Sequence, residues 1–447
     1  MEKTVKTRGG AGLSVTVIGA GLAGCEAAWQ LLSQGLPVTL LDMKPRDLSP
    51  AHRSPRMAEL VCSNSFRSDS PDSAAGLLKE ELSRMDSLIM RAARDTRVPA
   101  GKALAVDREL FSRFVEETLR AHGSLSVRQE QVRNIPRERP LIIATGPLTS
   151  EELALSIAGV TGAKSLFFYD AISPVIESDS IDYSKVFRAS RYEEGAGDYI
   201  NCPLNSDTYE ALVKSIRDGD EVPLRDFEDR KCFEGCLPLE VMVRRNHETP
   251  RYGPMKPVGL KDPRTGRQPW AVVQLRRENN EGTLYSMVGF QTKLTRPEQK
   301  RIFRMIPGLE NAEFARYGSI HRNTYIDSPT LLEPSLELKG HGGLFFAGQI
   351  TGVEGYIESA AMGLLAGINA GALARRGFMP PPPPPETALG SLIRHLGTRT
   401  GAAFQPMNVN FGLFPPLPGR IPRKERGRHY ARRSLEHLAR WQEHAKD

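Results

Sequence analysis

The chain has 447 residues, of which 40% are hydrophobic, and its formal net charge is +7. This length gives room for about three domain-sized units and a large core, while no apolar run is long enough to span a bilayer. Five cysteines are too few for a disulfide framework, and the N-terminus lacks the apolar core of a signal peptide. We therefore expect a cytoplasmic protein with free thiols.

The most informative stretch is an apolar, β-branched run from Val15 that leads into a glycine motif and then a helix. In a dinucleotide-binding fold, the first glycine of G-x-G-x-x-G makes a tight turn, the second lets the backbone approach a pyrophosphate, and the third allows close helix packing. A second apolar run then ends at an acid that can bind a ribose hydroxyl. The predicted contacts are Gly19, Ala20, Gly21, Leu22, Ala23, Gly24 and Asp42.

An irregular stretch over residues 43–71 follows, and such a long loop inside a domain is uncommon unless it is functional. We then expect helices over residues 74–94 and 107–122 and a buried strand over 140–146. Near residue 190 the pattern changes to charged stretches with short strands, which predicts an inserted α+β domain. Its expected strands cover residues 239–243, 271–275 and 283–289.

The first pattern returns with a strand over residues 343–348 and a helix of small residues over 359–372. The glycine turn between them, with Gly348 and Gln349, is what a flavin-type dinucleotide domain needs near its isoalloxazine ring. The prolines over residues 379–385 predict a stiff linker or surface loop.

The predicted fold class is thus α/β, with a Rossmann-like FAD-binding domain, built on a doubly wound parallel sheet, and an inserted α+β domain. The predicted boundaries are 13–189 and 316–418 for the FAD-binding domain, 190–315 for the inserted domain and 419–447 for a basic helical tail.

The tail carries much of the positive charge, since residues 419–447 contain nine Lys or Arg and four acidic residues. Tyr430, Leu435, Leu438 and Trp441 give it an apolar face. Composition alone fits a solvated amphipathic helix as well as a surface that binds RNA phosphates.

Several motifs in a fixed order resemble one family, the folate- and FAD-dependent RNA uracil-5-methyltransferases of the TrmFO type. The resemblance runs from about residue 13 to 440. A more distant likeness is to the FAD-binding subunit that modifies wobble uridines in tRNA, although such subunits are longer. The motifs lie at residues 50–52, 58–65, 233–238, 253–259, 288–291, 321–326, 347–356 and 404–408.

The resemblance implies that FAD relays a carbon from 5,10-methylenetetrahydrofolate to C5 of a uridine in RNA, with NADPH or NADH as reductant. C5 of uracil becomes nucleophilic when a thiolate adds to C6, and a base must later take the C5 proton. The family motifs place Cys62 and Cys236 in these roles, and we favour Cys236 as the nucleophile. Cys62 lies in a polar loop with Arg67 close enough in sequence to favour a thiolate.

By family position, His321 stacks on the pterin of the folate and Tyr356 meets the flavin. The resemblance also favours RNA contacts in the tail, through Arg423, Lys424, Arg426 and Arg428.

Other interpretations stay open. Each cysteine or histidine alone is more often structural, and Cys232 with Cys236 and His247 has an unusual spacing for zinc, so we expect no metal. The RNA could be tRNA, which we favour, or 23S ribosomal RNA. A non-catalytic RNA-binding flavoprotein and a small-molecule flavin oxidoreductase are the remaining classes. We expect no membrane association and a monomer or weak homo-oligomer.

Overall fold

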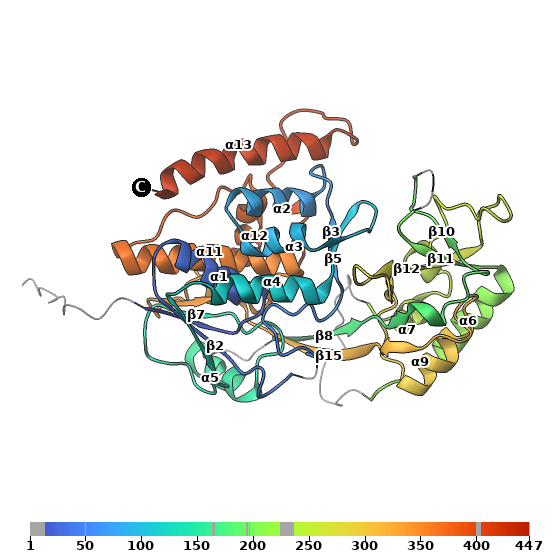
Figure 1. Ribbon diagram of the computed structural model, residues 1–447. Coiled ribbons are helices and arrows are strands. Elements are labelled where there is room, and N and C mark those ends of the chain that lie inside the picture. The colour runs from blue at the N-terminus through green and yellow to red at the C-terminus, as the bar shows by residue number, and fades with distance from the viewer. Residues whose placement is uncertain are drawn as a thin grey trace, which may run out of the picture.

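The computed structural model describes residues 14–49, 51–162, 166–193, 195, 197–223, 237–398 and 404–446. A parallel sheet of five strands forms the centre of the first domain, with β1 between β2 and β7 (Figure 1). In sheet order its strands are β16 (Leu344–Phe346), β7 (Leu141–Ile143), β1 (Val15–Ile18), β2 (Val38–Asp42) and β6 (Leu125–Gln129). The predicted α/β fold is confirmed.

Helices cover this sheet on both sides. In Figure 1, α2, α12 and α13 are layered above α1 and α11, and α5 lies below the sheet. The helices are α1 (Leu22–Ser33), α2 (Ala74–Arg84), α3 (Leu88–Asp95), α4 (Arg108–Arg120), α5 (Glu151–Thr161), α10 (Ser328–Leu331), α11 (Tyr356–Arg376), α12 (Ala388–Gly397) and α13 (Arg426–Lys446).

The helix expected over residues 74–94 is in fact two helices. Asp86 between them has φ of +53°, which ends α2, and the Ser87 side chain accepts the Met90 N–H to begin α3. The long irregular stretch contains one short strand, β3 (Ser65–Ser68), which pairs with β5 (Ala103–Val106); β4 (Arg97–Val98) completes this small sheet.

The second domain is built on a six-stranded antiparallel sheet. In order its strands are β10 (Phe187–Arg188), β11 (Ile200–Leu204), β12 (Ala271–Arg277), β13 (Leu284–Met287), β9 (Val175–Glu177) and β14 (Phe314–Arg316). Its helices are α6 (Ser206–Asp218), α7 (Leu239–Arg245), α8 (Thr249–Tyr252) and α9 (Arg296–Phe303). Because β9 and β14 belong to this sheet, the second domain starts before the predicted boundary at residue 190 and extends through Arg316, one residue past the predicted boundary at 315.

The strand expected over residues 239–243 is wrong, since this segment is helix α7. Valines favoured a strand, but Leu239 and Val243 are spaced four apart and both are buried on one helix face. Tertiary burial therefore overrode local β-propensity.

A two-stranded ribbon joins the domains. β8 (Leu166–Ile172) leaves the first domain and pairs, antiparallel along its whole length, with the returning β15 (Ser319–Tyr325). Figure 1 shows this ribbon running between the two sheets.

Helix α11 lies in the hydrophobic core of the first domain. It is the one helix among the described residues with the length and apolarity of a membrane span, and 83% of its apolar window is buried inside the structure. A Cβ on Gly363 would lie 2.2 Å from the carbonyl oxygen of Ala23 in α1, and one on Gly367 would lie 2.7 Å from that of Ala27. The two helices therefore touch backbone to backbone.

This contact predicts that Gly363→Ala destabilises the protein, because the new Cβ would clash with the backbone of α1. We expect a loss of about 3 kcal/mol, at the upper end of overpacking costs. Gly159→Ala in α5 is the matched control, since nothing lies within 4 Å of its Cβ. It should leave the thermal unfolding midpoint unchanged or raise it, and equal midpoints for the two variants would contradict the packing argument.

Candidate active site

The turn between β1 and α1 is closed toward the sheet and open toward a pocket. Gly19 has φ of +100°, and a Cβ there would lie 2.5 Å from the Ala144 carbonyl oxygen. A Cβ on Gly24 would lie 1.7 Å from the Gly19 carbonyl oxygen, so α1 packs directly on the turn. At Gly21, by contrast, no atom lies within 4 Å of the Cβ position.

Asp42 lies at the end of the neighbouring strand β2. Its Oδ2 accepts the Ala20 N–H at 2.5 Å, and its Oδ1 accepts the Lys44 N–H at 2.8 Å. Carboxylate oxygens have further lone pairs, so this group can still accept a ribose hydroxyl. The pocket beside it spans about 1060 Å³, including space that is open to solvent, and is lined in part by Gly19, Gly21, Leu22, Ala23 and Asp42. Its glycine backbone, the N-terminus of α1 and the Asp42 carboxylate fit a dinucleotide.

The second glycine turn meets the first. Gly348 has φ of +82°, and a Cβ there would lie 2.7 Å from the Cβ of Ala23. Gln349 and Tyr356, which follow it, line both this pocket and a second one of about 1340 Å³. The two pockets also share Val61, Pro147 and Leu148.

The second pocket brings Cys62 and His321 together with the shared residue Tyr356. Its lining also includes charged and amide side chains, among them Arg67, Asp170, Arg276, Asn323, Glu354 and Asn408. Two positions that lie 259 residues apart in sequence thus face one cavity beside the dinucleotide cradle.

The backbone of Cys62 is fixed on both sides. Its N–H donates to the Tyr356 hydroxyl at 2.8 Å, and its carbonyl oxygen accepts from Arg108 at 3.2 Å and from Arg316 at 3.1 Å. The sequence pointed instead to Arg67, but that guanidinium pairs with the buried Glu358. Arg108 and Arg316 were missed because they bind backbone carbonyls, which leaves no local motif.

His321 presents a neutral imidazole at neutral pH. Burial, followed by the charges of Arg53 and Arg316, lowers its pKa below the usual range. The Nε2 atom lies 2.8 Å from the Ser319 hydroxyl, which fixes the ring on strand β15. A neutral, oriented ring suits stacking on a flat heterocycle.

Glu354 is a further polar group of the second pocket that sequence analysis did not single out. It is almost fully buried and accepts the Gln349 side-chain N–H at 2.6 Å. Burial, and then the neighbouring Asp170 carboxylate, raises the pKa of Glu354 well above its usual range, which favours its protonated form. Its position within the quoted motif over residues 347–356 is the signal that could have revealed it.

The other cysteines differ from Cys62. Cys25 and Cys202 are fully buried, and burial raises the pKa of both thiols above their usual range, so they have ordinary structural roles. Cys232 and Cys236 lie outside the described residues. Leu239, three residues after Cys236, donates its N–H at 2.8 Å to the carbonyl of Gln291, which lines the second pocket.

Comparisons with known proteins identify the family. Residues 14–377 match the family model described as glucose inhibited division protein A. A methylenetetrahydrofolate-tRNA-(uracil-5-)-methyltransferase TrmFO from Syntrophus aciditrophicus is 61% identical over 431 residues, which covers 96% of this chain and 97% of that protein. The TrmFO of Geobacter sulfurreducens is 59% identical over 429 residues, with coverage of 96% and 98%. The chain belongs to the TrmFO family.

A solved structure agrees at the level of fold. The structure of Aquifex aeolicus GidA in its form I crystal matches with a TM-score of 0.68 and 18% identity, covering 98% of this chain and 78% of that chain. The resemblance predicted from the sequence motifs is confirmed.

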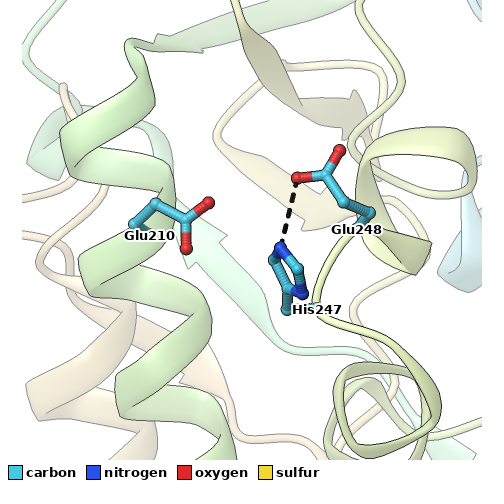
Figure 2. A group of neighbouring side chains, drawn as sticks. All are labelled: Glu210, His247 and Glu248. Carbon is cyan, nitrogen blue, oxygen red and sulfur yellow. Dashed lines mark ion pairs between the residues drawn. The ribbon is translucent and has the colours of Figure 1, made fainter.

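A separate group of possible metal ligands lies in the second domain, away from the two pockets. Figure 2 shows Glu210 of α6 facing His247 and Glu248. Their ligand atoms lie within 4.8 Å of one another, and His247 Nε2 is 3.7 Å from Glu248. Glu210 and His247 are exposed, while Glu248 also pairs with Arg251 at 3.1 Å. Exposed acidic groups commonly lie close together without a metal ion, so this cluster alone does not identify a metal site.

The basic tail packs its apolar face and exposes its charges. Tyr430 stacks on Phe411, and Leu438 and Trp441 are buried. The Ser434 hydroxyl donates to the buried carboxylate of Glu81 on α2. The four tail residues predicted to bind RNA all have exposed side chains: Arg423, Lys424, Arg426 and Arg428.

Proposed function

We propose that this protein transfers the methylene carbon of 5,10-methylenetetrahydrofolate to C5 of a uridine in RNA and reduces it to a methyl group, giving 5-methyluridine. The observation that carries the proposal is the pair of adjoining pockets, since the dinucleotide cradle and the cavity of Cys62 and His321 share Gln349 and Tyr356. The names of the relatives support tRNA as the substrate, and we propose a uridine of the T-loop.

The residues of the cradle fit FAD. The backbone at Gly21 and the N-terminus of α1 would hold the pyrophosphate, and Asp42 would accept a ribose hydroxyl. When bound, FAD supplies the carbon relay and the electrons for the transfer, which NADPH or NADH replenishes. Gln349 and Tyr356 would then lie where the flavin site and the second pocket meet.

The remaining chemistry is assigned to side chains of this chain. The neutral ring of His321 stacks on the pterin and so orients the folate. The thiolate of Cys236 adds to C6 of the uracil, which makes C5 nucleophilic, and Cys62 accepts the C5 proton before the thiolate leaves again. We also propose a cytoplasmic location, with which an RNA substrate is consistent.

The decisive assay incubates unmodified tRNA and 23S ribosomal RNA transcripts with the protein, methylenetetrahydrofolate and NADPH. We expect 5-methyluridine in tRNA. Methylation of ribosomal RNA alone would show that the substrate is ribosomal RNA and not tRNA. Binding of RNA without methylation would favour a non-catalytic RNA-binding flavoprotein.

Gly21→Val should release FAD, because the side chain would enter space that the backbone leaves open toward the pyrophosphate. The free protein should still fold, since no atom lies within 4 Å of that Cβ. We expect the ratio of flavin to protein, measured by absorbance, to fall at least about tenfold, whereas Gly159→Ala should remain fully loaded. A stoichiometric flavin content in Gly21→Val would show that the fingerprint does not bind FAD.

Cys62→Ala and Cys236→Ala should each lower methylation by about 100- to 10,000-fold with FAD still bound. The losses should differ in kind. RNA containing 5-fluorouridine should still form a covalent adduct with Cys62→Ala but not with Cys236→Ala, as a denaturing gel would show. The reverse pattern would exchange the two roles, and Cys202→Ser serves as a control for substitution of a buried cysteine.

His321→Ala should raise the apparent KM for the folate roughly tenfold, because the ring no longer stacks on the pterin, while RNA affinity stays the same. In the unmodified protein, the low pKa of His321 means that the ring is already neutral above about pH 6.5. The folate KM should therefore be flat from about pH 7 to about pH 8.5. An unchanged folate KM in His321→Ala would leave this residue a structural role.

Replacing Arg423, Lys424, Arg426 and Arg428 together by Gln should weaken tRNA binding and reduce its log–log salt slope by roughly 0.7–0.9 for each phosphate that the tail no longer neutralises. A matched control replaces four half-exposed arginines that already pair with acids: Arg84, Arg91, Arg94 and Arg97. An unchanged slope in the tail variant would move the RNA surface elsewhere, and the second domain around Arg244, Arg245 and Lys256 would be tested next.

A further inference from the structure

Arg316 connects the second domain to the loop that carries Cys62. It is the last residue of β14, an edge strand of the six-stranded sheet. One guanidinium nitrogen donates to the Val61 carbonyl oxygen at 2.9 Å, and the other donates to that of Cys62 at 3.1 Å. The side chain thus holds two successive peptide groups from a different domain.

The first domain holds the same peptide from its other sides. Arg108, at the start of α4, donates to the carbonyl oxygens of Leu60 and Cys62, while the Tyr356 hydroxyl accepts the Cys62 N–H. With its N–H and its carbonyl both bonded, Cys62 has a fixed backbone orientation. The direction of its Cα–Cβ bond follows from these contacts, which restricts the thiol to the few positions that the side-chain rotamers allow.

The arrangement is costly, which points to a functional reason. Burial, and then the nearby charge of Arg108, lowers the pKa of Arg316 to about 10, and its Nε atom is buried without a hydrogen-bond partner among the described residues. Glu278, which pairs with Arg108 at 2.5 Å, is the nearby carboxylate that offsets these charges. Burying a second guanidinium at a carbonyl that already has a donor carries a desolvation cost.

We propose that Arg316 is a positioning residue, through which the second domain sets the orientation of the Cys62 thiol in the second pocket. The inference rests on the proposed function, in which Cys62 acts on the uracil ring. Three residues after Arg316, the chain enters β15, which carries His321. The residue that orients the folate and the residue that orients Cys62 are therefore adjacent parts of one segment.

The test compares Arg316→Met and Arg316→Lys with a matched control, Arg304→Met, in FAD-loaded full-length protein. Arg304 is also a half-buried arginine of the second domain, and it also donates two bonds to a backbone carbonyl, that of Ala312, at 3.1 and 3.0 Å. These hydrogen bonds and its ion pair with Glu313 at 2.7 Å all lie within the second domain. Any general destabilisation should therefore appear in both methionine variants.

We expect Arg316→Met to lower the kcat of tRNA methylation by about 10- to 100-fold, the cost of a small misplacement of a reacting group. The KM values for tRNA and folate, and the reduction of FAD by NADPH without RNA, should stay the same. Arg316→Lys keeps the charge and can bond one carbonyl, so it should recover part of the loss. Arg304→Met should retain its kcat. Equal losses in the two methionine variants would overturn the proposal.

A second measurement does not depend on methylation. The rate of iodoacetamide labelling at Cys62, followed by peptide mass spectrometry, should rise severalfold in Arg316→Lys, because the loop loses an anchor while the charge remains. Labelling at Cys202 should not change. An unaltered rate at Cys62 would overturn the positioning role. If Arg316→Lys changes the labelling rate at Cys62 but the protein without substitutions does not methylate RNA, the positioning role stands and only the proposed function is refuted.

Discussion

The geometry of both pockets depends on the backbone contact between α1 and α11. Gly24, Gly363 and Gly367 have no side chain where the two helices and the β1 turn meet, and a Cβ at any of them would lie less than 3 Å from a backbone carbonyl oxygen. This close approach brings the N-terminus of α1 beside the start of α11. The glycine cradle and Tyr356 therefore face the same space, although they are more than 300 residues apart.

The position of α11 determines the surroundings of the polar groups in the site. Tyr356 is the first residue of α11, and its hydroxyl accepts the N–H groups of Cys62 and Ser63 at 2.8 and 3.1 Å. Burial raises the pKa of the phenol above its usual range, so it remains neutral and serves as an acceptor. A helix position fixed by glycine packing is thus transmitted, through one hydroxyl, to the loop of the candidate catalytic cysteine.

Much of the fold could be predicted because its signals are local. The run from Val15 through Gly24 to Asp42 combines strand, turn and helix patterns that occur together in dinucleotide-binding folds, and the structure places Asp42 at the end of β2, where its Oδ2 accepts the Ala20 N–H. The strand predicted over residues 239–243 was wrong because the helix there is stabilised by burial of Leu239 and Val243 against distant segments. The residues next to this segment in the sequence give no indication of that burial.

The residues of the site also divide into those that local sequence motifs reveal and those that they do not. Cys62 and His321 were found through the motifs around them, and the structure brings both to one pocket. Arg108 and Arg316 were not found, because a guanidinium that binds backbone carbonyls imposes no spacing on its own segment. Such contacts form only when segments that are distant in sequence meet in the folded chain, within the first domain for Arg108 and between the two domains for Arg316, and the loop they hold has little secondary structure of its own. Its conformation is therefore set by long-range hydrogen bonds, and the second domain is part of the active site even where its side chains do not line the pocket.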